Sequence, residues 1–122
     1  METPVSDCAV IASSIGSISG EAFAVGERSP VALLSAGASA RMAVAETVTN
    51  LATSLIGRIE KVSLSANWMC SSGTPGDDAK LYEAVRAIGE AFCSSLGVCI
   101  PVGKDSMSMQ TRWNHEGVME SI

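Results

Sequence analysis

Short apolar segments alternate along this chain with two longer segments whose apolar residues recur at helical spacing. The first helical segment covers about residues 39–56, and the second follows residue 74. The recurring apolar residues are Val44, Val48, Leu51 and Leu55 in the first segment, and Leu81, Val85, Ile88, Phe92 and Leu96 in the second. Such spacing gives each helix one apolar face that must pack against another element.

The shorter apolar or alternating segments predict strands. They are residues 8–14, with the composition of a buried strand, 22–25, 58–66, 98–102 and 106–113. Strands that alternate with helices predict an α/β fold, or α+β sandwich, in which helices back a mixed sheet. Residues 114–122 follow no pattern and are expected to form a disordered tail.

Both helices carry boundary signals. Ser35 or Ser39 can cap the first helix, and Gly57 is expected to end it. Residues 74–77, with the sequence TPGD, resemble a capping box with proline at the first helical position. Gly97 is expected to end the second helix.

The composition excludes some classes of function. In 122 residues, 8 Lys and Arg against 13 Asp and Glu give a net charge of −5, which argues against nucleic-acid and anionic-membrane partners. No apolar run approaches the roughly 20 residues of a membrane span. The four cysteines form no CxxC pair and no zinc pattern with the single histidine. We therefore expect reduced thiols and a cytoplasmic protein.

Two polar residues could form a metal site. Glu46 and Asn50 are four residues apart on the first predicted helix, so their side chains project from one face. A carboxylate beside an amide oxygen suits Mg²⁺, although the same pair is common on a solvated helix face. Asp7 stands just before the first predicted strand, where an aspartate is usually a turn or cap residue.

The residues after the fourth predicted strand offer a second candidate site. Gly103 is followed by Lys104, Asp105 and Ser106, which supply a cation, an anion and a hydroxyl. They could hold a phosphate or organise a site, although the spacing is not that of a Walker A loop. A hairpin connection explains the same residues equally well.

Several long stretches resemble one enzyme family, phosphoribosylformylglycinamidine synthase. The matching stretches are PVSDCAV (4–10), GEAFAVGERSPVALL (20–34), ASARMAVAETVTN (38–50), LSANWM (64–69), PGDDAKLYEAVRAIGEAFC (75–93) and IPVGKDSMSMQTRW (100–113). The resemblance implies an internal piece of that large enzyme, similar to the N-terminal domain of its second half, which is related to aminoimidazole ribonucleotide synthetase. Residues 1–113 would then be an incomplete copy of that domain.

The resemblance also implies roles for site residues. Asp7, Glu46 and Asn50 match the family positions that hold Mg²⁺ around a bound adenine nucleotide, ATP or ADP. Ser6 matches the nucleotide contact, where the family often has alanine. Lys104, Asp105 and Ser106 belong to a family signature whose individual roles the spacing does not assign.

The activity implied for the parent is that of an ATP-dependent C–N ligase of the glutamine amidotransferase type. It converts formylglycinamide ribonucleotide, glutamine and ATP to formylglycinamidine ribonucleotide in purine biosynthesis. The fragment alone is expected to be inactive, and its expected partners are the rest of the synthase or a second copy bound through the sheet. The alternative is a non-catalytic dimerising or scaffold module in which the site residues are relics.

Overall fold

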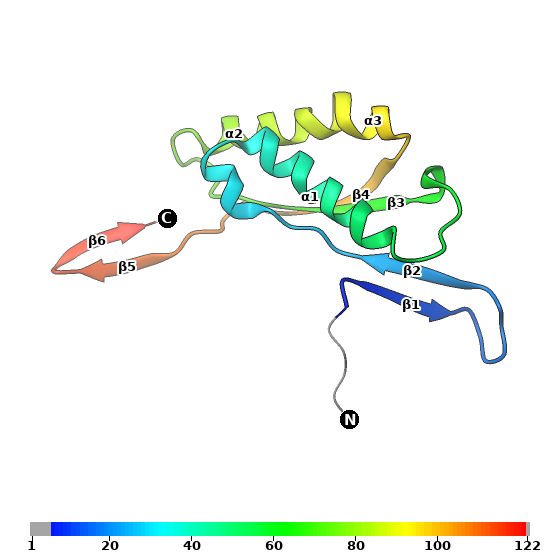
Figure 1. Cartoon of the computed structure of the whole chain (residues 1–122). Coiled ribbons are helices and arrows are strands. Elements are labelled where there is room, and N and C mark those ends of the chain that lie inside the picture. The colour runs from blue at the N-terminus through cyan, green and yellow to red at the C-terminus, as the bar shows by residue number, and fades with distance from the viewer. Residues whose placement is uncertain (1–5, 122) are drawn as a thin grey trace.

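A computed structural model describes residues 6–121 of the chain, and it contains three helices and six strands with short 3-10 and π-helical turns between them. Figure 1 shows α1 lying above the strands and the second helical segment beside it. In chain order the elements are β1 Cys8–Ala12, β2 Gly20–Ala24, α1 Ala36–Leu51, β3 Ser63–Met69, α2 Asp77–Arg86, α3 Cys93–Leu96, β4 Cys99–Ser106, β5 Arg112–His115 and β6 Val118–Ser121. This mixture of helices and strands confirms the predicted fold class.

The strands form three separate pairs. β1 and β2 are antiparallel, β3 and β4 are parallel, and β5 and β6 are antiparallel. The parallel pair is the expected consequence of a helical crossover between its strands. The sequence predicted one mixed sheet, and the structure differs because no ladder of hydrogen bonds joins these pairs within residues 6–121.

Helix α1 begins where the sequence predicted a cap. The side chain of Ser35 accepts a hydrogen bond from the backbone N–H of Ala38 at 3.2 Å. Ser39, the other candidate cap, lies inside the helix and is buried. The helix ends at Leu51, before Gly57, so the predicted C-terminal boundary was too late.

The second helical segment begins differently from its prediction. Helix α2 starts at Asp77 after Gly76, which adopts a left-handed conformation with φ of 91°. Thr74 does not cap the helix, because its hydroxyl bonds to Ser71 Oγ at 2.9 Å. A π-helical turn, Ala87–Phe92, joins α2 to α3, and left-handed Gly97 ends the segment as predicted.

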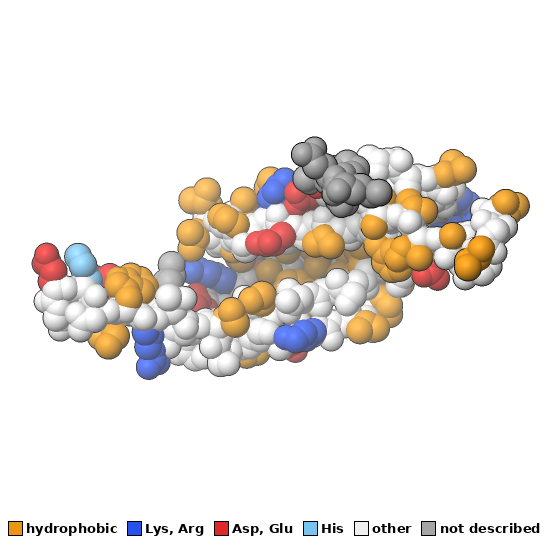
Figure 2. Space-filling view, turned by 90° about the horizontal axis from the view of Figure 1, so that it is seen from below, with side chains coloured by type: hydrophobic (Ala, Val, Ile, Leu, Met, Phe, Trp, Pro, Cys, Tyr) orange, Lys and Arg blue, Asp and Glu red, His pale blue; other side chains and the backbone are white. Residues whose placement is uncertain are grey.

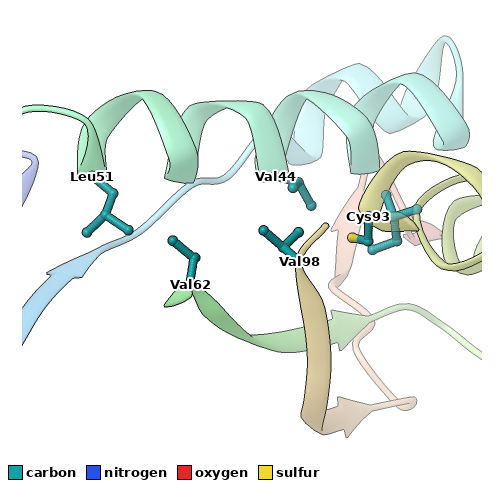
Figure 3. Close-up of a cluster of buried hydrophobic side chains, with 6 residues drawn as sticks. Val44, Leu51, Val62, Cys93 and Val98 are labelled. Carbon is teal, nitrogen blue, oxygen red and sulfur yellow. The ribbon is translucent and has the colours of Figure 1, made fainter. Parts of the chain in front are cut away.

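The core is small and lies between α1, the π-helical turn and the start of the parallel strand pair (Figure 3). Its buried side chains are Val44, Leu51, Val62, Ile88, Cys93 and Val98. No large side chain in the described residues is completely buried. Burial also raises the pKa of the Cys93 thiol, with a smaller contribution from Cys99.

Several apolar residues that the sequence placed in the core are exposed. Val10 and Ile11 of β1 are 68% and 58% exposed, so β1 is not a buried strand. Leu55 lies beyond the end of α1 and is fully exposed. Val85 is 42% exposed, whereas its neighbour Ala84 is buried.

The C-terminal residues form a hairpin. β5 and β6 pair from Arg112 opposite Ser121 to His115 opposite Val118, and the hairpin projects from the rest of the molecule (Figure 1). The predicted disordered tail is therefore wrong for residues 114–121, and residue 122 lies outside the described residues. None of the helices within residues 6–121 has the length and hydropathy needed to cross a membrane.

The packing identifies Ile88 as the side chain on which the core most depends. Ile88 is 3% exposed, so Ile88→Ala should lower the free energy of unfolding by about 2–5 kcal/mol. Val85→Ala, on the same helical segment but 42% exposed, should cost less than about 1 kcal/mol. Urea unfolding followed by circular dichroism measures the free energy of unfolding of both variants. Equal losses of this free energy would contradict the description of the core.

Candidate functional site

The segment that follows β2, residues 25–28, lies against helix α1 and positions the candidate site. Gly26 makes the closest approach: a Cβ at this position would overlap the carbonyl oxygen of Ala43 and Oγ1 of Thr47. Only glycine fits between the segment and the helix without a shift of the backbone. We call residues 25–28 the strap.

Polar side chains of α1 hold the strap through its backbone. Asn50 Nδ2 donates to the carbonyl oxygen of Val25 at 3.0 Å, and the N–H of Glu27 donates to Glu46 Oε2 at 2.8 Å. Ser39 Oγ donates to the carbonyl oxygen of Arg28 at 2.7 Å. These bonds satisfy backbone groups of the strap, which belongs to no strand.

Arg28 brings a cation to the same place. Its Nη2 lies 2.8 Å from Glu46 Oε1, and the side chains of Arg28 and Glu46 are 46% and 24% exposed. At this exposure the ion pair contributes at most about 1 kcal/mol to stability, so its main effect is on local charge. The Glu46 carboxylate is thus oriented by two contacts, one through each oxygen.

These residues line a shallow pocket of about 290 Å³ on the exposed side of α1. Its lining residues are Arg28, Met42, Ala45, Glu46, Thr49 and Asn50. Because Asn50 uses its amide nitrogen on Val25, its amide oxygen is the atom left to meet a cation. The structure therefore brings Glu46 and Asn50 together, as the four-residue spacing predicted.

Asp7 directly precedes β1, whose first residue pairs with the last residue of β2. In the antiparallel pair Cys8 stands opposite Ala24, and continuing this register by one residue puts Asp7 opposite Val25. Asp7 is exposed, and the Ser6 hydroxyl before it donates to the carbonyl oxygen of Cys8 at 2.7 Å. The residue that Asp7 faces is thus the one whose carbonyl Asn50 holds.

Carboxylates by themselves do not form a metal site here. Across residues 6–121, no three His, Cys, Asp or Glu side chains gather closely enough to hold a metal ion. A cation at Glu46 would therefore depend on amide oxygens, water and the oxygens of a bound phosphate, which is how Mg²⁺ is commonly held.

Lys104, Asp105 and Ser106 lie elsewhere, at the end of β4. They pair with residues 67–69 of β3, and Lys104 Nζ bonds to Ser106 Oγ at 2.8 Å. The hairpin interpretation of these residues is wrong, because they are part of a strand in a parallel pair. None of the three lines the pocket beside Glu46.

Sequence reasoning missed the strap. It gave neither Gly26 nor Arg28 a place in the site, and it considered Ser39 only as a cap. The available signal was Gly26 itself, two residues beyond the end of β2, because a glycine leaves room for another part of the backbone to approach closely. That signal does not say which element is approached.

The whole chain matches one family model. Residues 1–122 match the model described as the FGAR-AT PurM_N-like domain, where FGAR-AT denotes formylglycinamide ribonucleotide amidotransferase. The chain belongs to this family. Membership relates the domain to purine biosynthesis, to nucleotide-binding proteins in general and to a larger ATP-dependent synthase of the ligase type.

The tight fit of the strap can be tested at Gly26. Gly26→Ala should destabilise the domain by about 1–3 kcal/mol, because the new methyl group would collide with α1. Gly89→Ala is the matched control: apart from its chain neighbours and the backbone of its own helix, no atom lies within 4 Å of the added Cβ, and alanine should stabilise that helical turn by up to about 1 kcal/mol. Thermal unfolding of both variants provides the measurement. An unchanged melting temperature in Gly26→Ala would show that the strap does not lie against α1.

Proposed function

We propose that this domain supplies part of a magnesium–nucleotide site to formylglycinamide ribonucleotide amidotransferase. In this proposal Asp7, Glu46 and Asn50 hold Mg²⁺, and Ser6 contacts the adenine nucleotide, ATP or ADP. The observation that carries the proposal is the placement of Glu46 and Asn50 side by side on α1, both bonded to the strap beside the strand end that bears Asp7.

The chemistry of the donors supports a hard cation. Carboxylate and amide oxygens are the ligands that Mg²⁺ takes, and the ion would neutralise charge on the phosphates of a bound nucleotide. Glu46 is already oriented through both oxygens, which lowers the entropy cost of ligation. Arg28 must share the carboxylate or release it, and its guanidinium is suited to bind a phosphate oxygen.

The proposed parent reaction converts formylglycinamide ribonucleotide, glutamine and ATP to formylglycinamidine ribonucleotide. The residues at the strap bind and orient a nucleotide, and none of them is placed as a nucleophile or general base. We propose that the domain acts with the rest of the synthase, or with a second copy bound through the sheet, in the cytoplasm. Lys104, Asp105 and Ser106 are proposed as a separate phosphate-binding or site-organising group.

A second function, a non-catalytic dimerising module, is favoured by other observations. Both oxygens of Glu46 already have partners within the protein, so the carboxylate has a purely structural use. Val10, Ile11 and Phe23 are between 52% and 68% exposed on the first strand pair, which suits contact with another protein surface.

Calorimetric titration of the purified chain with ADP in the presence of Mg²⁺ separates the two functions. We expect saturable binding that depends on Mg²⁺ and is weakened at least about tenfold in Glu46→Gln, because the variant keeps an acceptor for the Glu27 N–H but loses the charge. Glu90→Gln is the matched control, since Glu90 pairs with Arg86 on an exposed helix face away from the strap.

Two outcomes would contradict the proposed site. One is nucleotide binding of equal strength in Glu46→Gln and the unmodified chain. The other is no heat of binding at all, together with a stable dimer in sedimentation velocity, which would favour the dimerising module.

A further inference from the structure

The ion pair between Arg28 and Glu46 occupies the carboxylate that a metal ion would need. Arg28 Nη2 lies 2.8 Å from Glu46 Oε1, and the N–H of Glu27 donates to Glu46 Oε2 at 2.8 Å. Both oxygens of the carboxylate therefore have a partner within the protein. A guanidinium held at this distance also repels a divalent cation that approaches the same oxygen.

The charges in the pocket beside Glu46 oppose either ligand alone. Of the described residues that line this pocket, only Arg28 and Glu46 are charged, and their charges cancel. Even with the negative charge of the nearby Asp7, Mg²⁺ alone would leave an excess of positive charge. A phosphate group alone would leave an excess of negative charge. The pocket therefore favours a metal ion and a phosphate group that bind together.

The backbone of Arg28 is fixed, whereas its side chain can turn. Ser39 Oγ donates to the Arg28 carbonyl oxygen at 2.7 Å, and the N–H of Val31 donates to the same oxygen at 3.1 Å. The side chain is 46% exposed, and its remaining hydrogen bond among the described residues runs from Nη1 to the carbonyl oxygen of Glu27 at 3.3 Å. The guanidinium can therefore leave Glu46 without disturbing the strap.

We propose that Arg28 couples the metal ion to the nucleotide. While Arg28 holds Glu46, it opposes the binding of Mg²⁺. When the guanidinium turns to a phosphate group of the nucleotide, Glu46 Oε1 becomes available to the ion. The coupling rests on the proposed magnesium–nucleotide site, and it adds that the ion and the nucleotide strengthen each other's binding by the same factor.

The guanidinium is suited to this exchange of partners. Its N–H groups form a fork that can pair with a carboxylate or with a phosphate. Arg28 is also the one cation among the described residues that line the pocket. Figure 2 shows the Lys and Arg side chains of one face scattered rather than gathered into a patch among the described residues. A phosphate group at the pocket would therefore depend on Arg28 and the metal ion for its counter-charge.

Two binding measurements on the 122-residue chain test the coupling in Arg28→Gln. Electron paramagnetic resonance of free Mn²⁺ measures binding of the metal ion alone, and calorimetric titration with ADP in the presence of Mg²⁺ measures binding of the complex. We expect Mn²⁺ to bind at least about fivefold more tightly to the variant, because the repelling charge is gone. The complex of ADP with Mg²⁺ should bind at least about tenfold more weakly, because the phosphate loses a charged partner.

Two further variants separate charge from shape and position. Arg28→Lys keeps the charge but loses the fork, so Mn²⁺ should bind as weakly as to the unmodified chain, and the ADP complex should be weakened less than in Arg28→Gln. Arg58→Gln is the matched control, because Arg58 pairs with the exposed Glu60 and lies outside the pocket. This control should change neither measurement.

Several outcomes in Arg28→Gln would overturn the proposal. They are weaker binding of both ligands, no change in either, and tighter Mn²⁺ binding with no weakening of the ADP complex. In these cases the proposed site itself stands if Glu46→Gln still weakens the complex. If Glu46→Gln binds both ligands as the unmodified chain does, or if the unmodified chain binds neither, the site and the coupling are both wrong.

Discussion

The close contact between the strap and helix α1 organises this domain. Gly26 lets the strap lie directly on the helix, and Asn50, Glu46 and Ser39 then bond to its backbone. The strap leads out of β2, so this contact also fixes the first strand pair relative to the helix. Without it, Arg28 would not lie beside Glu46, and the strand end that bears Asp7 would have no fixed position relative to α1.

A second feature of the fold is that its strand pairs stand apart over a shared core. Residues of α1, β2 and β3 line one cavity between the pairs, and the core beneath α1 also includes residues of the π-helical turn and of the start of the parallel strands. Ile88 is buried beneath the helices, but no hydrogen-bond ladder joins β2 to β3 within the described residues. The strap reaches both places: Val25 and Gly26 line the cavity between the strand pairs, and Arg28 lines the pocket beside Glu46.

Local features of the sequence predicted local structure well. The Ser35 cap, the left-handed Gly97 and the placement of Glu46 beside Asn50 all follow from rules that act over a few residues. The strap and the pairing of the strands, which the sequence did not predict, depend on distant partners. The strap contacts α1 some 20 residues later, and a run of apolar residues does not say whether a strand finds neighbours on both sides.

The most direct test of the account is where a paramagnetic ion binds. Mn²⁺ in place of Mg²⁺, added with ADP to isotopically labelled protein, broadens the amide signals nearest to the metal. We expect the strongest broadening at residues 25–28 and 46–50, followed by residues 6–8, with reversal by excess Mg²⁺. Broadening centred on the acidic first turn of α2 at Asp77, or on residues 104–106, would contradict the proposed site.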